Sequence, residues 1–144
     1  MKTLITNSFE ETQKLGLEFA QKLKGGEVIC LHGDLGSGKT TFVQGLAEGL
    51  GIKQRIISPT FIIMRTYTIS HTLYAIRNFY HVDLYRIESE KDVEGLGLLE
   101  LIGDPENVVV IEWPEKIEGI LPENTIDLYF EYIEDDKREI KFGD

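Results

Sequence analysis

The chain carries, from residue 33, the stretch Gly33-Asp34-Leu35-Gly36-Ser37-Gly38-Lys39-Thr40, whose glycines, lysine and hydroxyl have the spacing of a phosphate-binding P-loop. An apolar run at residues 28–31 precedes the stretch, and residues 42–47 continue it with helical periodicity. Glycine permits the positive φ angles that turn successive N–H groups inward, and a helix start favours an anion. The sequence therefore predicts a nucleotide-binding site at residues 33–41.

Lys39 and Thr40 are the two side chains that a P-loop uses directly. The lysine contacts the β- and γ-phosphates, and the hydroxyl binds Mg²⁺. We expect ATP and Mg²⁺ as cofactors, and ATP rather than GTP because the guanine-recognition pattern Asn-Lys-x-Asp is absent. The nucleotide contacts expected from the loop are Leu35, Gly36, Ser37, Gly38, Lys39, Thr40 and Thr41.

Length and composition narrow the class of protein. A chain of 144 residues has the length of one domain, so we expect residues 1–144 to form a single P-loop ATPase domain. The formal net charge of −10 speaks against a nucleic-acid surface, which needs clustered Lys and Arg. Cys30, the single cysteine, excludes an internal disulfide and should be a buried thiol. Without a signal-peptide pattern or a membrane-spanning run, we expect a cytoplasmic protein with no membrane partner.

Helical periodicity predicts two principal helices and two short ones. The first begins at Asn7 or Ser8 as N-cap and ends at residues 24–26, and the second covers residues 39–50. The short helices are expected over residues 90–96 and 98–102. Gly45 and Gly49 lie inside the second helix, where each costs about 1 kcal/mol relative to alanine. They indicate either close backbone packing or a tolerated cost.

The remaining apolar runs predict the strands of a mixed sheet. Runs rich in β-branched and aromatic residues indicate a partly antiparallel meander at residues 56–61, 62–67, 73–76 and 79–86. Residues 108–111 are continuously apolar, as in a strand buried on both faces. Residues 125–133 and 138–142 are typical of a hairpin. Together they predict an α/β, P-loop NTPase-like domain: a central mixed sheet, helices on both faces, and a β-meander or hairpin addition.

Two acidic residues end predicted strands next to the P-loop. Glu112 ends the most apolar strand, and Asp83 ends the meander. Because the carboxyl ends of strands line the ligand crevice of open α/β sheets, both carboxylates can face the phosphates. We assign Glu112 to Mg²⁺, directly or through water, and Asp83 to supporting the metal or orienting the attacking water. The alternative for either residue is a helix cap or a surface ion pair.

Three further side chains leave alternatives open. Thr60, held by Pro59, is either a catalytic hydroxyl that senses the γ-phosphate or an ordinary turn residue. His81 shares one strand face with Asp83, so the two act together unless His81 is simply packed or exposed. Trp113 is either a contact surface or a core side chain.

Four blocks of this sequence resemble the TsaE family, formerly YjeE, the small bacterial P-loop ATPases of the tRNA threonylcarbamoyladenosine pathway. The blocks are residues 33–41, Ser58-Pro59-Thr60-Phe61, His81-Val82-Asp83-Leu84-Tyr85-Arg86 and Ile111-Glu112-Trp113-Pro114, in family order. Residues 11–12, 15–16 and Arg138 also match, so the resemblance covers nearly the whole chain.

The resemblance implies a protein that hydrolyses ATP while bound to a TsaB–TsaD pair. That pair transfers threonylcarbamoyl to the adenosine beside the tRNA anticodon, so tRNA would be a partner only indirectly. The isolated protein should hydrolyse ATP slowly, because an unassisted P-loop site can lack up to about 10⁵-fold of rate that a supplied arginine provides. The site residues implied are Thr40 and Glu112 at Mg²⁺, Asp83 near the γ-phosphate, and Thr12 and Arg138 near the nucleotide.

The same P-loop permits two other functions. One is a kinase that phosphorylates a small metabolite, although the five arginines of the chain are few for closing over two phosphorylated ligands. The other is an adaptor in which ATP binding, without hydrolysis, orders the loop around Thr60 and exposes a docking face. Labelled γ-phosphate on a metabolite would favour the kinase. Partner complementation by a hydrolysis-dead variant would favour the adaptor.

Overall fold

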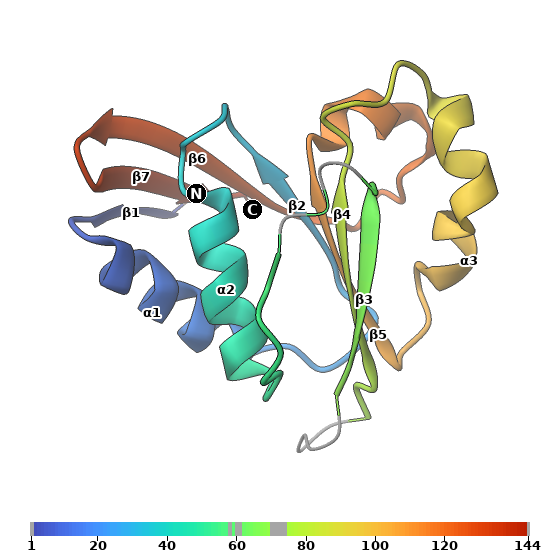
Figure 1. The fold of residues 1–144 in the computed structure, drawn as a ribbon, viewed down its shortest axis with the longest axis horizontal. Helices are drawn as coiled ribbons and strands as arrows, with labels where there is room; N and C mark the ends of the chain where they lie inside the picture. The colour runs from blue at the N-terminus through green and yellow to red at the C-terminus, as the bar shows by residue number, and fades with distance from the viewer. Residues whose placement is uncertain (1, 58, 60–61, 70–74, 144) are drawn as a thin grey trace.

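A mixed sheet forms the centre of the fold in the computed structural model, which describes residues 2–57, 59, 62–69 and 75–143. Within these residues the sheet has seven strands, in the order β1-β7-β6-β2-β5-β4-β3 (Figure 1). The strands are β1 Lys2–Thr6, β2 Val28–His32, β3 Met64–Thr68, β4 Asn78–Asp83, β5 Asn107–Glu112, β6 Ile126–Glu134 and β7 Lys137–Phe142. The expected α/β class and the C-terminal hairpin of β6 and β7 are confirmed.

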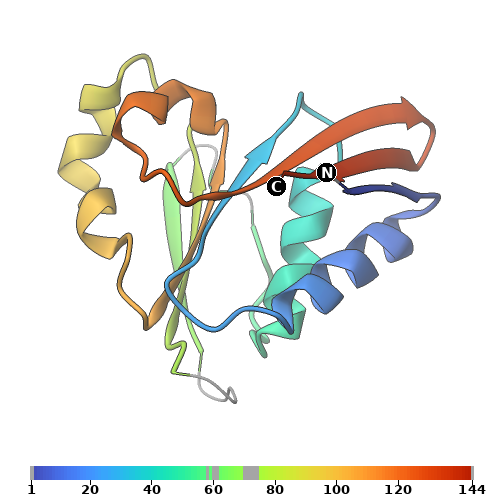
Figure 2. The same cartoon turned by 180° about the vertical axis from the view of Figure 1, so that it is seen from behind.

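Helices cover both faces of this sheet, as the sequence predicts (Figures 1 and 2). On one face lie α1 (Phe9–Ala20), which Ser8 caps, and α2 (Lys39–Gly49). On the other face lie three short elements: η1 (Glu90–Leu96), α3 (Leu98–Leu101) and η2 (Pro114–Ile120). No helix within the described ranges combines the length and the apolar character needed to cross a bilayer.

The sheet separates two apolar clusters, and strand β2 contributes to both. Ile29 and Leu31 face α1 and α2, whereas Val28 and Cys30 face the short helices. This alternation follows from the pleat of a strand, which sends successive side chains to opposite faces. Strand β5 is buried along its whole length, as its continuously apolar sequence predicts.

Cys30 is the buried thiol that the sequence predicts. The residue is 1% exposed. Burial raises the pKa of Cys30 to about 12, with a further contribution from the negative charge of Asp127. The thiol is therefore protonated at neutral pH.

The three central strands β2, β5 and β4 run parallel and end at one edge of the sheet. Strand β2 pairs with β5 so that Leu31 lies opposite Glu112. Strand β4 pairs with β5 so that Asp83 also lies opposite Glu112. Since the P-loop follows β2 directly, this register brings both predicted acids to the edge where the loop begins.

Helices α1 and α2 approach so closely that glycine is required where they touch. A β-carbon at Gly45 would lie 1.9 Å from the carbonyl oxygen of Gln13, and one at Gly49 would lie 2.6 Å from the β-carbon of Ala20. A β-carbon at Gly16 of α1 would lie 2.2 Å from the carbonyl oxygen of Phe42. Close packing, not a tolerated cost, therefore explains the glycines of α2.

The structure differs from the predicted strands in several places. The sequence does not predict strand β1, because it is an exposed edge strand that pairs with β7 and carries little apolar pattern. Residues 56–57 and 75–76 form no strand; Ile56 and Ile76 belong to the cluster beneath α1 and α2, so their apolar character reflects core packing.

The predicted meander is confirmed in part, as the antiparallel pair β3 and β4. Residues 62–63 and 84–86, also predicted as strand, form turns and irregular backbone. Residues 58, 60–61 and 70–74 lie outside the described part of the chain.

Candidate functional site

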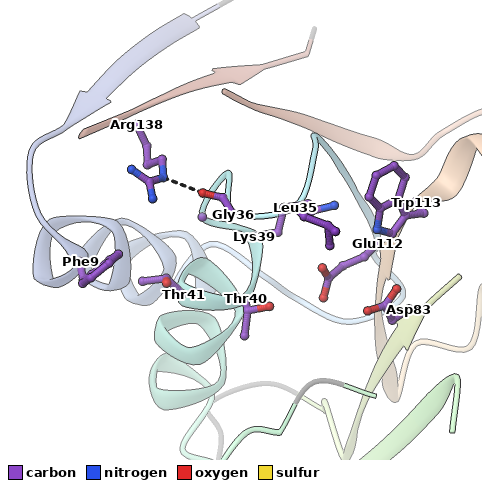
Figure 3. Close-up of a pocket in the computed structure, with 11 residues that line it drawn as sticks. Phe9, Leu35, Gly36, Lys39, Thr40, Thr41, Asp83, Glu112, Trp113 and Arg138 are labelled. Carbon is purple, nitrogen blue, oxygen red and sulfur yellow. Dashed lines mark hydrogen bonds between the residues drawn. The ribbon is translucent and has the colours of Figure 1, made fainter. Parts of the chain in front are cut away.

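A cavity of about 300 Å³ lies between the P-loop, the start of α2 and the ends of β4 and β5 (Figure 3). One side is formed by the loop and the first turn of α2: Leu35, Gly36, Gly38, Lys39, Thr40 and Thr41. The opposite side is formed by Asp83, Glu112 and Trp113. Phe9 of α1 and Arg138 of β7 complete the lining. The structure thus gathers most of the sequence-predicted site residues around one space.

The P-loop backbone has the conformation that its glycines allow. Gly33, Gly36 and Gly38 have φ angles of 147°, 78° and 104°, a region that other residues rarely adopt. Helix α2 begins after Gly38 without a side-chain cap, so no side chain at the cap position takes up the N–H groups of its first turn. Ser37 is buried, and its hydroxyl has no hydrogen-bond partner among the described residues. Positive φ angles at glycines and a helix start without a side-chain cap are features of anion-binding loops.

Lys39 is held inside the site between uncharged groups. Its ammonium donates a hydrogen bond of 2.5 Å to the carbonyl oxygen of Gly33 and lies 4.1 Å from the centroid of the Trp113 ring. Burial lowers the pKa of Lys39, and the negative charges of Glu112 and Asp83 act in the opposite direction. A phosphate would give this ammonium the anionic partner that a buried cation requires.

Asp83 and Glu112 are buried carboxylates, 4% and 3% exposed, at the ends of neighbouring strands. One carboxylate oxygen of Asp83 accepts a hydrogen bond of 3.0 Å from the backbone N–H of Tyr85. Both acids line the cavity together with Thr40, as Figure 3 shows. They are therefore not surface ion pairs, and they bring oxygen ligands to the same space as the P-loop.

His81 forms a hydrogen bond with Glu112 of the neighbouring strand. Its Nε2 lies 2.5 Å from Oε2 of Glu112, and the histidine is 0% exposed. Although His81 and Asp83 alternate on one strand, the pairing of β4 with β5 brings the ring to the acid of the neighbouring strand. The expected partnership between His81 and Asp83 is not among the hydrogen bonds found for His81 in the described part of the chain.

Trp113 packs against the core and also borders the cavity, while its role as a contact surface remains a prediction. It borders the cavity under the Lys39 ammonium and packs against the apolar cluster of the short helices. Its ring centroid lies 5.2 Å from that of Tyr85. The backbone at Trp113 has a φ of 60°, an unusual value for a bulky residue. This conformation lies directly after Glu112, where β5 ends and the chain turns into η2.

Arg138 connects the C-terminal hairpin to the P-loop. Its Nε donates a hydrogen bond of 3.0 Å to the carbonyl oxygen of Gly36, the contact drawn in Figure 3. Its Nη1 donates to the carbonyl oxygen of Asp135 at 2.6 Å, and the guanidinium lies over the Tyr132 ring at 4.7 Å. Arg138 therefore braces the loop and borders the cavity at the same time.

Two predicted nucleotide contacts in the described part of the chain, Thr12 and Ser37, are not on the cavity wall. Thr12 is 1% exposed, and its hydroxyl shares a 2.7 Å hydrogen bond with that of Thr6 in β1. Its expected contact with the nucleotide remains a prediction. Thr60 lies outside the described residues, so its expected role also remains a prediction.

Phe9 is a cavity residue that sequence reasoning missed. It is the first residue of α1 and is 49% exposed at the mouth of the cavity. Its sequence neighbours carry no motif, and only the packing of α1 against α2 brings it near the P-loop. The sequence gives one indication of this role: Phe9 is an aromatic residue directly after the helix N-cap, in an otherwise polar turn.

Comparison with known proteins gives a consistent result. The family model described as "Threonylcarbamoyl adenosine biosynthesis protein TsaE" matches residues 6–140. The chain belongs to the TsaE family. The TsaE protein of Bacillus subtilis is 41% identical over 133 residues, which cover 92% of this chain and 79% of that protein. The TsaE protein of Treponema pallidum is 38% identical over 136 residues, covering 94% and 96%.

A solved structure supports the same placement within the TsaE family. The crystal structure of Bacillus subtilis YdiB superposes with a TM-score of 0.73 at 35% sequence identity, covering 98% of this chain and 83% of that one. The region matched by the TsaE model includes the P-loop, both strand-end acids and Arg138. The resemblance inferred from the four sequence blocks is therefore confirmed.

Proposed function

We propose that this TsaE-family protein is a Mg²⁺-dependent ATPase that assists a TsaB–TsaD pair in the threonylcarbamoyl modification of tRNA. The observation that carries the ATPase assignment is the single cavity in which P-loop amides and Lys39 face the carboxylates of Asp83 and Glu112. The names of the related proteins, which place them in tRNA threonylcarbamoyladenosine biosynthesis, support the pathway.

The chemistry of the donor groups fits Mg²⁺. The candidate ligands are the Thr40 hydroxyl and the Glu112 carboxylate, both hard oxygen donors on the cavity wall. The described residues contain no group of three or more His, Cys, Asp or Glu side chains able to hold a metal alone. That agrees with Mg²⁺, which commonly takes one or two carboxylates and completes its shell with phosphates and waters. When bound, the ion neutralises charge on the phosphate oxygens.

Phosphate binding and orientation of the attacking water are assigned to residues of the chain itself. The N–H groups of the loop and the Lys39 ammonium bind the phosphates. Asp83, buried and fixed by the Tyr85 N–H, is placed to accept a hydrogen bond from a water and so orient it. Arg138 is already bonded to Gly36 and Asp135. Slow turnover by the isolated protein follows if a partner supplies the cationic group that stabilises the transferring phosphate.

The direct test is phosphate release with and without purified TsaB and TsaD, together with co-elution of the three proteins. We expect release of inorganic phosphate to accelerate when both partners are added, by up to about 10⁵-fold if an arginine is supplied. Label recovered on a metabolite would indicate a kinase instead. Unchanged turnover without co-elution would reject the partner-activated function.

A further inference from the structure

His81 is a fully buried polar side chain with one strong contact. Its side chain is 0% exposed, and that of Glu112 is 5% exposed. The 2.5 Å contact from Nε2 to Oε2 uses one ring nitrogen, and Nδ1 has no hydrogen-bond partner within the described residues. Burying an unpartnered polar nitrogen costs free energy that an apolar side chain would avoid. Packing of strand β4 alone therefore does not explain a histidine at this position.

The contact between the two side chains has the geometry of a hydrogen bond, with Nε2 of His81 as the donor and Oε2 of Glu112 as the acceptor. It joins a ring buried inside the sheet to the acid at the end of the neighbouring strand. The contact therefore restrains Glu112 from a side chain of another strand.

We infer that His81 is a positioning residue that holds the Glu112 carboxylate in its metal-binding orientation. This inference rests on the proposed Mg²⁺-dependent function. The ring contacts Oε2 and is not among the residues that line the cavity, whereas Glu112 is. The contact uses one carboxylate oxygen, so Oε1 is the oxygen that we assign to the metal. Hydrogen bonds from outside the ligand set commonly orient metal-binding side chains in this way.

Three substitutions at one position separate the hydrogen bond from the shape of the ring. His81→Gln places an amide N–H close to the position of Nε2 and keeps the donor. His81→Asn has the same amide on a shorter side chain, near the position of Nδ1, and cannot reach Glu112. His81→Met removes the donor and replaces the ring with an apolar side chain of similar length. Thermal unfolding of each variant without ligand reports whether the fold is retained.

The primary measurement is the affinity for ADP by calorimetry, once in EDTA and once across a Mg²⁺ titration, followed by partner-stimulated phosphate release. We expect His81→Met and His81→Asn to need about 10- to 100-fold more Mg²⁺ for half of the metal-dependent gain in affinity. Their affinity for metal-free ADP should match the wild type, with a reduced kcat. His81→Gln should restore the wild-type Mg²⁺ requirement.

Each contrary result overturns the inference by itself. A wild-type Mg²⁺ requirement in folded His81→Met would show that the bond does not orient Glu112. A folded His81→Gln as impaired as His81→Met would show that the ring's shape matters and its donor does not. If His81→Met fails to fold, the Mg²⁺ requirements of His81→Gln and His81→Asn are compared instead, and equal requirements would overturn the inference. Absence of nucleotide binding in the wild type would instead reject the proposed function.

Discussion

The two walls of the cavity are built in opposite ways. The P-loop wall comes from one stretch of the chain, within residues 35–41, whose backbone dihedrals shape it, and its Leu35 is 67% exposed. The facing wall consists of Asp83, Glu112 and Trp113, and its two acids come from separate strands and are almost completely buried. One wall is determined locally, and the other exists only after β4 and β5 have paired.

This difference predicts a division of labour between the walls. Backbone N–H groups on the loop wall bind any suitably placed phosphate, so that wall should determine affinity. The acid wall depends on strand register, because a slip of one residue between β4 and β5 would end the pairing of Asp83 with Glu112 and move one acid to the other face of the sheet. Its groups act on the metal and the attacking water, so that wall should determine turnover.

The largest effect is expected from Glu112→Gln, which keeps the shape of the acid wall and removes its charge. Phosphate release in the presence of TsaB and TsaD should fall about 10²- to 10³-fold, because Mg²⁺ loses the carboxylate that would hold it at the reacting phosphate. ADP affinity measured in EDTA should remain unchanged. Glu118→Gln, at an exposed position in η2, is the matched control and should keep full activity. Undiminished turnover in Glu112→Gln would contradict the division between walls.

A smaller effect, and one on binding, is expected from Lys39→Ala in the loop wall. Removing the ammonium should weaken ADP binding about 10- to 100-fold, the cost of losing a hydrogen bond between charged groups. Calorimetry in EDTA measures the contribution of Lys39 to ADP affinity without any contribution from the metal. Lys53→Ala, at an exposed position, controls for the general loss of one positive charge. Equal affinities for wild type and Lys39→Ala would mean that the loop wall binds through its backbone alone.

The smallest effect on turnover is expected from Gly45→Ala, which changes the support of the loop wall without touching its surface. The new β-carbon would lie 1.9 Å from the Gln13 carbonyl oxygen, so α1 and α2 must separate. We expect a loss of about 1 to 3 kcal/mol in unfolding free energy, measured with denaturant, even though alanine favours helix. Gly95→Ala has no atom within 4 Å of the added carbon and is the control. Equal losses of unfolding free energy in both variants would mean that replacing any glycine has this cost, and that helix packing at Gly45 is not its cause.

The same division explains how much the sequence could predict. The phosphate cradle was predictable from eight residues, because glycine, lysine and threonine at fixed spacing determine local backbone geometry. The positions of Asp83 and Glu112 were predictable as strand ends, because parallel strands end at one edge. The contact between His81 and Glu112 was not, because alternation along one strand does not identify the side chain opposite on the next.

Other features escaped prediction because their signals are not local. Strand β1 forms by pairing with β7 at the far end of the chain, and its exposed residues show no apolar pattern. Phe9 becomes a cavity residue only when α1 packs on α2. Conversely, Ile56 and Ile76 have strand-like neighbours but fill the core from irregular segments. An apolar run reports burial more reliably than it reports backbone conformation.

The protonated, inaccessible thiol of Cys30 has a practical consequence for experiments on complexes. Thiol-directed dyes react with exposed thiolates, and Cys30 offers neither exposure nor thiolate at neutral pH. Since Cys30 is the single cysteine, we expect maleimide dyes not to label the folded chain. A cysteine introduced on any outer surface would carry a fluorophore at that position alone, so energy transfer could map where companion proteins sit.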